Sequence, residues 1–135
     1  MTRPLPMVLA AVLAAGSGCS AREDAGSPES GMRLFLAAAR AGDRFAVYER
    51  FGPQTRARVQ GLAASASKLG VRRAFNPEDF VSVGWVASSW EPTGVRGLRR
   101  GKDDAEVEVY SAAGDRQAVR LVRENKQWKV ELPAR

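Results

Sequence analysis

The sequence predicts a single α+β domain in which three helices come first and a curved antiparallel sheet of about five strands follows. Apolar residues recur at helical spacing between residues 31 and 69, and from Phe80 onward they alternate with polar residues. Glycine, proline and asparagine separate these segments. With 135 residues, of which 44% are apolar, the chain is long enough for one globular core. We expect that domain to span residues 31–133.

Residues 1–18 have the pattern of a bacterial export signal. Arg3 supplies a positive charge, residues 5–15 are mostly apolar, and residues 16–18 are small. Eleven residues rising 1.5 Å each are too short to cross a hydrocarbon layer of about 30 Å. The segment is therefore interpreted as a signal peptide and not as a transmembrane helix.

Cys19 is the single cysteine and directly follows the small residues. This arrangement resembles the bacterial lipobox, in which the thiol receives a diacylglyceryl group, the leader is removed and the new amino group is acylated. Gly16 stands where that signal usually has leucine. Two or three acyl chains attach a protein stably to a membrane. We expect lipidation of Cys19 and a lipid-anchored location in the bacterial cell envelope, at the outer membrane or its periplasmic face. The alternative is a secreted soluble protein cleaved near Ala15 or Gly18.

Residues 19–30 are predicted to be the lipidated cysteine and a flexible tether, because they are small or polar and contain no apolar pair. Helix signals already begin at the end of this segment. Ser27 can serve as an N-cap, Pro28 suits the first helical position, and Glu29 suits the positive end of the helix dipole.

Three helices are expected after the tether. In the first, Leu34, Phe35, Ala38 and Ala41 follow helical spacing, and Gly42 can close it in the left-handed conformation. Asp43 can cap a second helix, which has Phe45, Tyr48 and Phe51 near one side. A third starts at Gly52-Pro53 and ends at Gly70, and its apolar face would contain Val59, Leu62, Ala63, Ala66 and Leu69.

Strands are expected after a turn in which Asn76 caps and Pro77 takes the first position. The alternating segments are 81–88, 95–100, 105–111, 116–124 and 128–132, with Gly97 weakening the second. Short turns join them, which favours an antiparallel meander. Glu106 and Glu108 lie opposite the apolar face of their strand and are expected to be solvated or paired with Arg96, Arg120 or Lys129.

The helix pair and the last hairpin carry a resemblance to a known superfamily. The positions that carry it in the first two helices are Phe35, Leu36, Ala39, Gly42, Asp43, Tyr48, Pro53 and Arg56, and residues 119–133 with Trp128 carry it in the hairpin. The layout resembles the nuclear transport factor 2-like superfamily, which has a cystatin-like cone fold, and in particular its small bacterial lipoproteins of unassigned function. The resemblance implies a pocket at the open end of the cone and a candidate homodimer.

The residue inventory argues against common catalytic sites. The chain has no histidine, which removes the usual general base, and one cysteine without histidine offers no zinc-site spacing. Enzymes that share the fold need a pocket acid, but Asp43 is better explained as a cap and Glu49 as a solvated residue between two arginines. The candidate pocket residues are Tyr48, Asp79, Trp85, Trp90 and Trp128, for which a core or rim position is the alternative. No catalytic residue, cofactor or metal is expected.

The charge balance is basic, with 21 Lys and Arg against 15 Asp and Glu. The densest basic run contains Arg96, Arg99, Arg100 and Lys102, which could contact anionic lipid headgroups or polysaccharide; a plain solvated face is the alternative. Nucleic acid is not expected for an exported domain without interleaved aromatic residues. The sequence therefore predicts a non-enzymatic ligand-binding or assembly module whose partners are the membrane and an envelope protein, lipid or polysaccharide. A pocket enzyme of isomerase, dehydratase or hydrolase type is the alternative.

Overall fold

The computed structural model describes residues 25–69, 74–81 and 92–134 and confirms the α+β class, with three helices followed by an antiparallel sheet. Its elements are α1 (Pro28–Arg40), α2 (Arg44–Glu49), α3 (Pro53–Lys68), the short 3-10 helix η1 (Pro77–Phe80), β1 (Pro92–Arg100), β2 (Asp104–Ser111), β3 (Arg116–Glu124) and β4 (Gln127–Glu131). The strand expected at 81–88 lies outside the described residues except for Val81, which is buried after η1.

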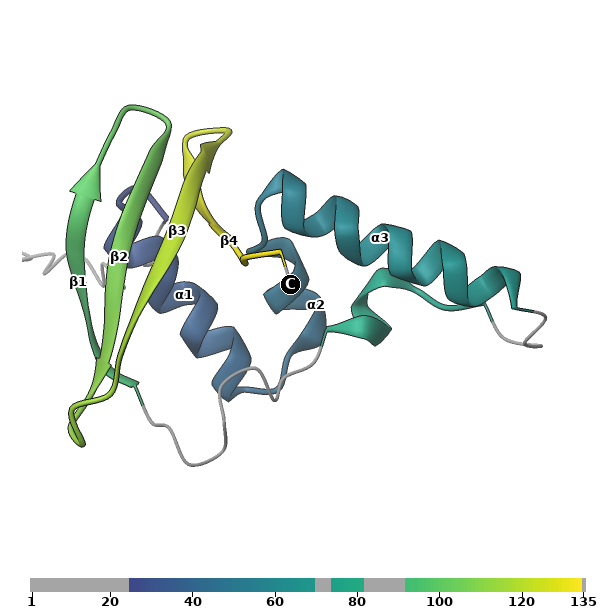
Figure 1. Cartoon of the computed structure of the whole chain (residues 1–135), viewed down its shortest axis with the longest axis horizontal. Coiled ribbons are helices and arrows are strands. Elements are labelled where there is room, and N and C mark those ends of the chain that lie inside the picture. Colours follow the sequence, from purple (N-terminus) through teal and green to yellow (C-terminus); the bar gives the residue numbers. More distant parts are fainter. Residues whose placement is uncertain (1–24, 70–73, 82–91, 135) are drawn as a thin grey trace, which may run out of the picture.

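The four described strands form a meander in the order β1-β2-β3-β4, and every neighbouring pair is antiparallel (Figure 1). The β3–β4 turn is built by Asn125 and Lys126, which have φ angles of 51° and 65°. Two consecutive positive φ angles are typical of a type I′ hairpin, whose twist matches that of the strands. The register of β1 shifts between Gly97 and Arg99, in line with the weak point expected at this glycine.

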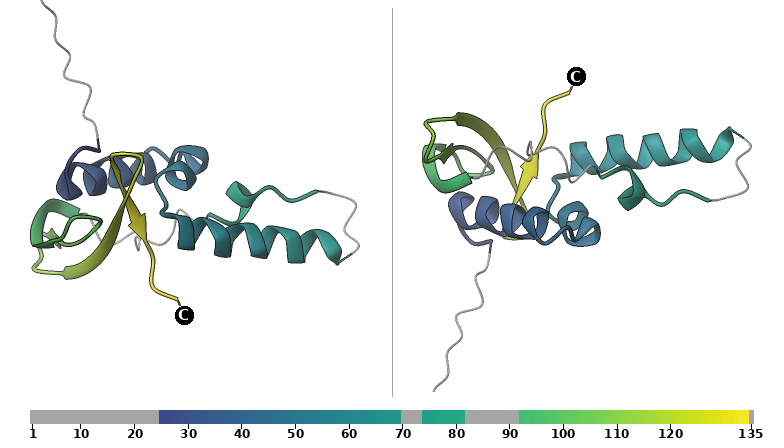
Figure 2. Two further views of the ribbon diagram at one scale, coloured as in Figure 1. Left: turned by 90° about the horizontal axis from the view of Figure 1, so that it is seen from above. Right: turned by 90° about the horizontal axis from the view of Figure 1, so that it is seen from below.

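Helix α1 packs across one face of the sheet, which we call the inner face (Figures 1 and 2). Along β2, Ala105, Val107 and Val109 are buried on this face, whereas Glu106 and Glu108 point to the opposite, outer face. The core is completed from the helices, β3 and β4 by Met32, Phe35, Leu36, Val47, Tyr48, Phe51, Val81, Val119, Leu121, Trp128 and Val130. The inner face is thus largely covered by the core, apart from a hollow of about 240 Å³ between α1 and the start of β1.

The folded unit begins before residue 31. Ser27 caps α1 by accepting a hydrogen bond from the Ser30 N–H at 3.1 Å, and Pro28 is buried at the first helical position. The Trp128 N–H donates to the Ala25 carbonyl at 2.9 Å, and Ala25 is itself buried. Residues 25–30 therefore belong to the domain and not to the expected tether, because they cap α1 and extend its contact with β4.

Helix α2 has the expected cap but not the expected apolar side. Asp43 accepts a hydrogen bond from the Ala46 N–H at 3.0 Å, and Gly42 before it has a φ of 67°. Phe45, which we expected beside Tyr48, is 62% exposed. The helix is only six residues long and turns Val47 and Tyr48 toward the core, which leaves Phe45 on the solvent side.

Helix α3 projects away from the sheet (Figure 2). Its start is joined to β4, where the Gly52 N–H donates to the Val130 carbonyl at 2.8 Å, and the helix also contacts η1. Ala63 is buried, but Leu62 and Leu69 of the expected apolar face are 57% and 81% exposed. The prediction was wrong for these two leucines because the described part of the sheet does not extend beneath them.

Candidate functional site

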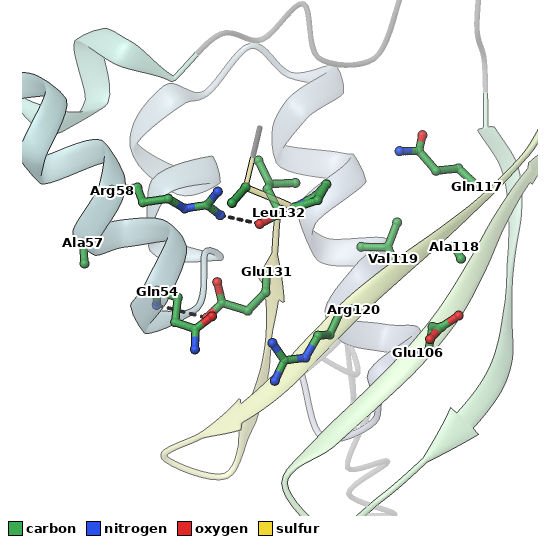
Figure 3. A pocket seen from close by; sticks show the side chains of 12 residues that line it. Gln54, Ala57, Arg58, Glu106, Gln117, Ala118, Val119, Arg120, Glu131 and Leu132 are labelled. Carbon is green, nitrogen blue, oxygen red and sulfur yellow. Dashed lines mark hydrogen bonds between the residues drawn. The ribbon is translucent and has the colours of Figure 1, made fainter.

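A groove of about 690 Å³ lies between the first turns of α3 and the outer face of the sheet (Figure 3). Its floor comes from β2 and β3, and the chain after β4 closes one side. The residues that line it are Gln54, Ala57, Arg58, Glu106, Gln117, Ala118, Val119, Arg120, Glu131, Leu132, Pro133 and Ala134. Four separate stretches of sequence thus meet at one hollow.

Glu131 joins β4 to the start of α3. Its carboxylate accepts hydrogen bonds from the Gln54 N–H at 3.1 Å, the Thr55 N–H at 2.9 Å and the Thr55 hydroxyl. The N-cap of α3 is Gly52, which has no side chain to offer, so the first helical N–H groups would otherwise lack an acceptor. A carboxylate from a residue 77 positions later therefore caps the helix and also interacts favourably with its dipole.

The segment after β4 is held against α3 by a second set of contacts. The Leu132 N–H donates to the Thr55 hydroxyl at 3.0 Å, and the Arg58 guanidinium donates to the Leu132 carbonyl and to Thr55 Oγ1. Figure 3 shows Arg58 reaching over this segment from α3. The wall of the groove is consequently fixed by hydrogen bonds and does not depend on apolar packing alone.

The groove combines apolar walls with cationic groups. Ala57, Ala118, Leu132 and Pro133 supply apolar surface, and Arg120 extends from β3. Within the described ranges, no hydrogen bond or salt bridge involves the Arg120 guanidinium. The negative charge of Glu131 is already engaged by α3. The hollow can therefore accommodate an elongated ligand with an apolar body and an anionic or hydrogen-bond-accepting group.

The described candidate pocket residues do not line this groove. Tyr48 is a core residue whose hydroxyl accepts a hydrogen bond from Gln60 Nε2 at 2.8 Å, and Asp79 accepts one from the Asn76 N–H at 3.0 Å at the start of η1. Trp128 is only 1% exposed, and its indole N–H has no partner in the described part of the chain. Trp85, Trp90 and Cys19 lie outside the described residues.

The four residues of the basic run do not share one face of the sheet. On the outer face, Arg96 pairs with Glu108 at 2.6 Å and Arg99 pairs with Asp104 at 2.9 Å. The hydrogen-bonded Arg99 guanidinium lowers the pKa of the Asp104 carboxyl. Arg100 instead lies over the Trp128 ring at 5.8 Å, and Lys102 lies in the turn after β1. The pairing predicted between Glu108 and Arg96 is confirmed.

The sequence did not predict the groove. Of its lining residues, the sequence indicated a role only for Glu106 and Arg120, as a cross-strand pair. The single local signal was the absence of a capping side chain before Pro53, and nothing nearby showed which residue would replace it. Among residues 25–69, 74–81 and 92–134, no cluster of acidic, cysteine or histidine side chains could hold a metal ion. No helix in these ranges is long and apolar enough to cross a membrane.

No protein-family model, no curated protein and no solved structure matches this chain. The α+β class thus stands on the chain's own helices and sheet.

Proposed function

We propose that this chain is a bacterial envelope lipoprotein, anchored through Cys19, whose domain binds a ligand in the groove between α3 and the sheet without transforming it. The observation that carries the proposal is the groove itself, which combines apolar walls with the Arg120 guanidinium, placed in register between Glu106 and Glu131. The order of small residues and Cys19 after an apolar leader supports the anchor. Envelope proteins, lipids and polysaccharides are the candidate sources of ligand.

The acids of the groove support binding over catalysis. A pocket acid that works as a base needs a carboxylate free to take a proton. Both carboxylate oxygens of Glu131 instead accept hydrogen bonds from N–H and O–H groups of α3. Glu106 is opposite Arg120 on β3 and opposite Arg99 on β1, so cationic side chains flank it. Donor or cationic groups therefore surround both carboxylates. This arrangement is expected for the wall of a binding site and not for a catalytic base.

We also propose that the domain belongs to the nuclear transport factor 2-like superfamily. Helices that precede an antiparallel meander, with one helix across the inner face, agree with the resemblance to the nuclear transport factor 2-like superfamily. That resemblance also suggests a homodimer.

Octanoate and 1-octanol form a matched pair of probes for the groove, since they share the alkyl chain and differ in charge. In a titration followed by amide NMR, octanoate should shift the resonances of groove residues such as Gln54, Ala118 and Leu132 more than octanol does. Arg120→Ala should abolish this preference, because it removes a guanidinium that has no hydrogen bond or salt bridge among the described residues.

Arg116→Ala is the control, because it removes a charge from the same strand and the same face but outside the groove. Shifts that spread evenly over the domain, or that Arg120→Ala leaves unchanged, would reject the groove as the binding site.

The anchor has its own test. Cells given a palmitate analogue should label the wild-type chain but not Cys19→Ser, and the intact mass of the wild-type product should correspond to residues 19–135 with attached acyl chains. Equal labelling of both proteins would reject lipidation at Cys19.

A further inference from the structure

One end of the sheet contains two of its three hairpin turns and lies near Ala25, where the described chain begins. The β1–β2 turn (residues 101–103) and the β3–β4 turn (residues 125–126) lie at this end, which we call the anchor end (Figure 1). The Arg123 N–H donates to the Asp103 carbonyl at 2.7 Å, which places the end of β3 beside the first turn. Trp128, just after the second turn, donates its N–H to Ala25.

The position of Ala25 limits how the domain can sit on a membrane. Ala25 is six positions after Cys19, and even a fully extended chain of that length reaches only about 20 Å. Strand β3, with nine residues, is about 30 Å long. A lipid on Cys19 therefore holds the anchor end closer to the bilayer than the opposite end, where the β2–β3 turn lies.

Basic side chains are in excess at the anchor end. Arg99 forms a salt bridge with Asp104, and Glu124 forms one with Arg56. Four other basic residues come from the two turns and their flanks and are exposed: Arg100, Lys102, Arg123 and Lys126. The acidic residues without a salt bridge among the described residues here are Asp103 and Glu29. Two of the four basic residues belong to the run noted in the sequence, and the other two come from a hairpin more than 20 positions later.

We propose that the anchor end is a membrane-contact surface, on which Lys102 and Lys126 at the two turns, supported by Arg100 and Arg123, bind the anionic headgroups of the bilayer that holds the lipid anchor. The inference rests on the proposed anchoring through Cys19. Basic residues near an anionic leaflet attract it over roughly one Debye length, about 10 Å in 0.1 M salt. Contact must therefore be made by the turn tips, which the short tether brings into that range.

This orientation has a consequence for the groove. Its residues Gln117 and Ala118 lie near the start of β3, and Leu132–Ala134 follow the end of β4, so they lie toward the opposite end of the sheet. With the anchor end on the membrane, this part of the groove lies farther from the bilayer and is accessible to a ligand from the aqueous side.

The test uses the lipidated protein reconstituted in phosphatidylcholine vesicles with and without phosphatidylglycerol. Because Cys19 is blocked by lipid and is the single cysteine, an introduced cysteine is the one free thiol. Gln127→Cys places a fluorophore at the anchor end, and Ala113→Cys places it in the β2–β3 turn, both at exposed neutral positions. Headgroup-bound nitroxide lipids should quench the label at 127 more strongly than the label at 113, and phosphatidylglycerol should increase this difference.

Charge variants identify the contact. Lys102→Gln combined with Lys126→Gln should lower the ratio of membrane-contacting to free domains by about fivefold per lysine, whereas Arg116→Gln, at the far end, should leave it unchanged. Raising the salt concentration to about 1 M should have the same effect as the double substitution.

Three results would overturn parts of this proposal. Equal quenching at 127 and 113 would overturn the orientation, and a difference that is insensitive to phosphatidylglycerol and to the lysines would overturn headgroup contact. If the purified protein carries no lipid, the proposed anchor fails, and this inference fails with it. Octanoate binding in the groove would be unaffected by any of these results, so failure of the ligand-binding proposal is distinguishable.

Discussion

The carboxylate of Glu131 is 4% exposed, and its hydrogen-bond donors belong to α3. A buried carboxylate is costly unless donors surround it, and here two N–H groups and a hydroxyl do so. The same contacts satisfy the orphan donors at the start of a helix. One side chain therefore links the sheet edge to the helix, and its loss leaves unpaired donors at the start of α3.

Glu131→Ala should lower the free energy of unfolding by about 2–4 kcal/mol, since charge-assisted hydrogen bonds and a helix cap are lost together. Glu131→Gln should cost less, because the amide oxygen can still accept. Urea denaturation measures both. Glu49→Gln, at an exposed position, is the control and should change stability little. If Glu131→Ala were as harmless as this control, the capping role would be refuted.

The titration of Asp104 tests the ion pair that this residue forms with Arg99 on the outer face of the sheet. Arg99 lowers its folded-state pKa below the ordinary value of about 3.9. A lowered pKa means that the stability from this pair is present above the ordinary value and is lost as pH falls through the folded-state value. Carboxyl-carbon NMR should show the lowered pKa, and Arg99→Gln should raise it toward the ordinary value. Arg96→Gln, which breaks a different pair, should not.

At the scale of elements, two glycines in helices make a matched comparison. A Cβ on Gly31 of α1 would lie 2.6 Å from the Trp128 carbonyl oxygen and 2.9 Å from Trp128 Cβ, whereas one on Gly61 of α3 would meet nothing within 4 Å. Gly31→Ala should destabilise by about 1–3 kcal/mol, because α1 must move away from β4. Gly61→Ala should stabilise by about 0.5–1 kcal/mol through lower chain entropy in the unfolded state.

Thermal or urea unfolding of the two variants measures the difference. Both substitutions add one methyl group to a helical glycine, so intrinsic helix propensity is matched and the packing environment is what differs. A stabilising Gly31→Ala would mean that α1 and β4 do not approach as closely as described.

The elements that the sequence predicted well are those governed by local periodicity. The expected strand 116–124 matches β3, and the caps Ser27 and Asp43 are confirmed. The helix-face assignments for Phe45 and Leu62 failed because burial depends on what a helix packs against, and that is set by residues far along the chain. The groove was beyond prediction for the same reason, since it arises only when Gln54 and Glu131 are brought together.

For the whole molecule, the contacts divide the described chain into a firmly packed body and a helix held mainly at one end. Strands β2 and β3 are hydrogen bonded on both sides, and both contribute buried residues to the core. Beyond Ala63, α3 has no buried residue, and the Phe75 N–H, in the segment before η1, donates to Ser67 Oγ in this half. Regions with few buried apolar contacts open locally at a lower free energy than the global unfolding reaction.

Hydrogen exchange followed by NMR should therefore show two classes of amide. Those of Val107, Val109 and Leu121 should exchange only through global unfolding and respond strongly to added urea, whereas those of residues 64–68 should exchange through a local opening that urea hardly affects. Glu131→Ala should extend the fast class toward residue 56, because it removes the attachment at the start of α3. If the amides of α3 instead followed the strands in every condition, α3 would be part of the same cooperative unit, and the wall of the groove would be as rigid as its floor.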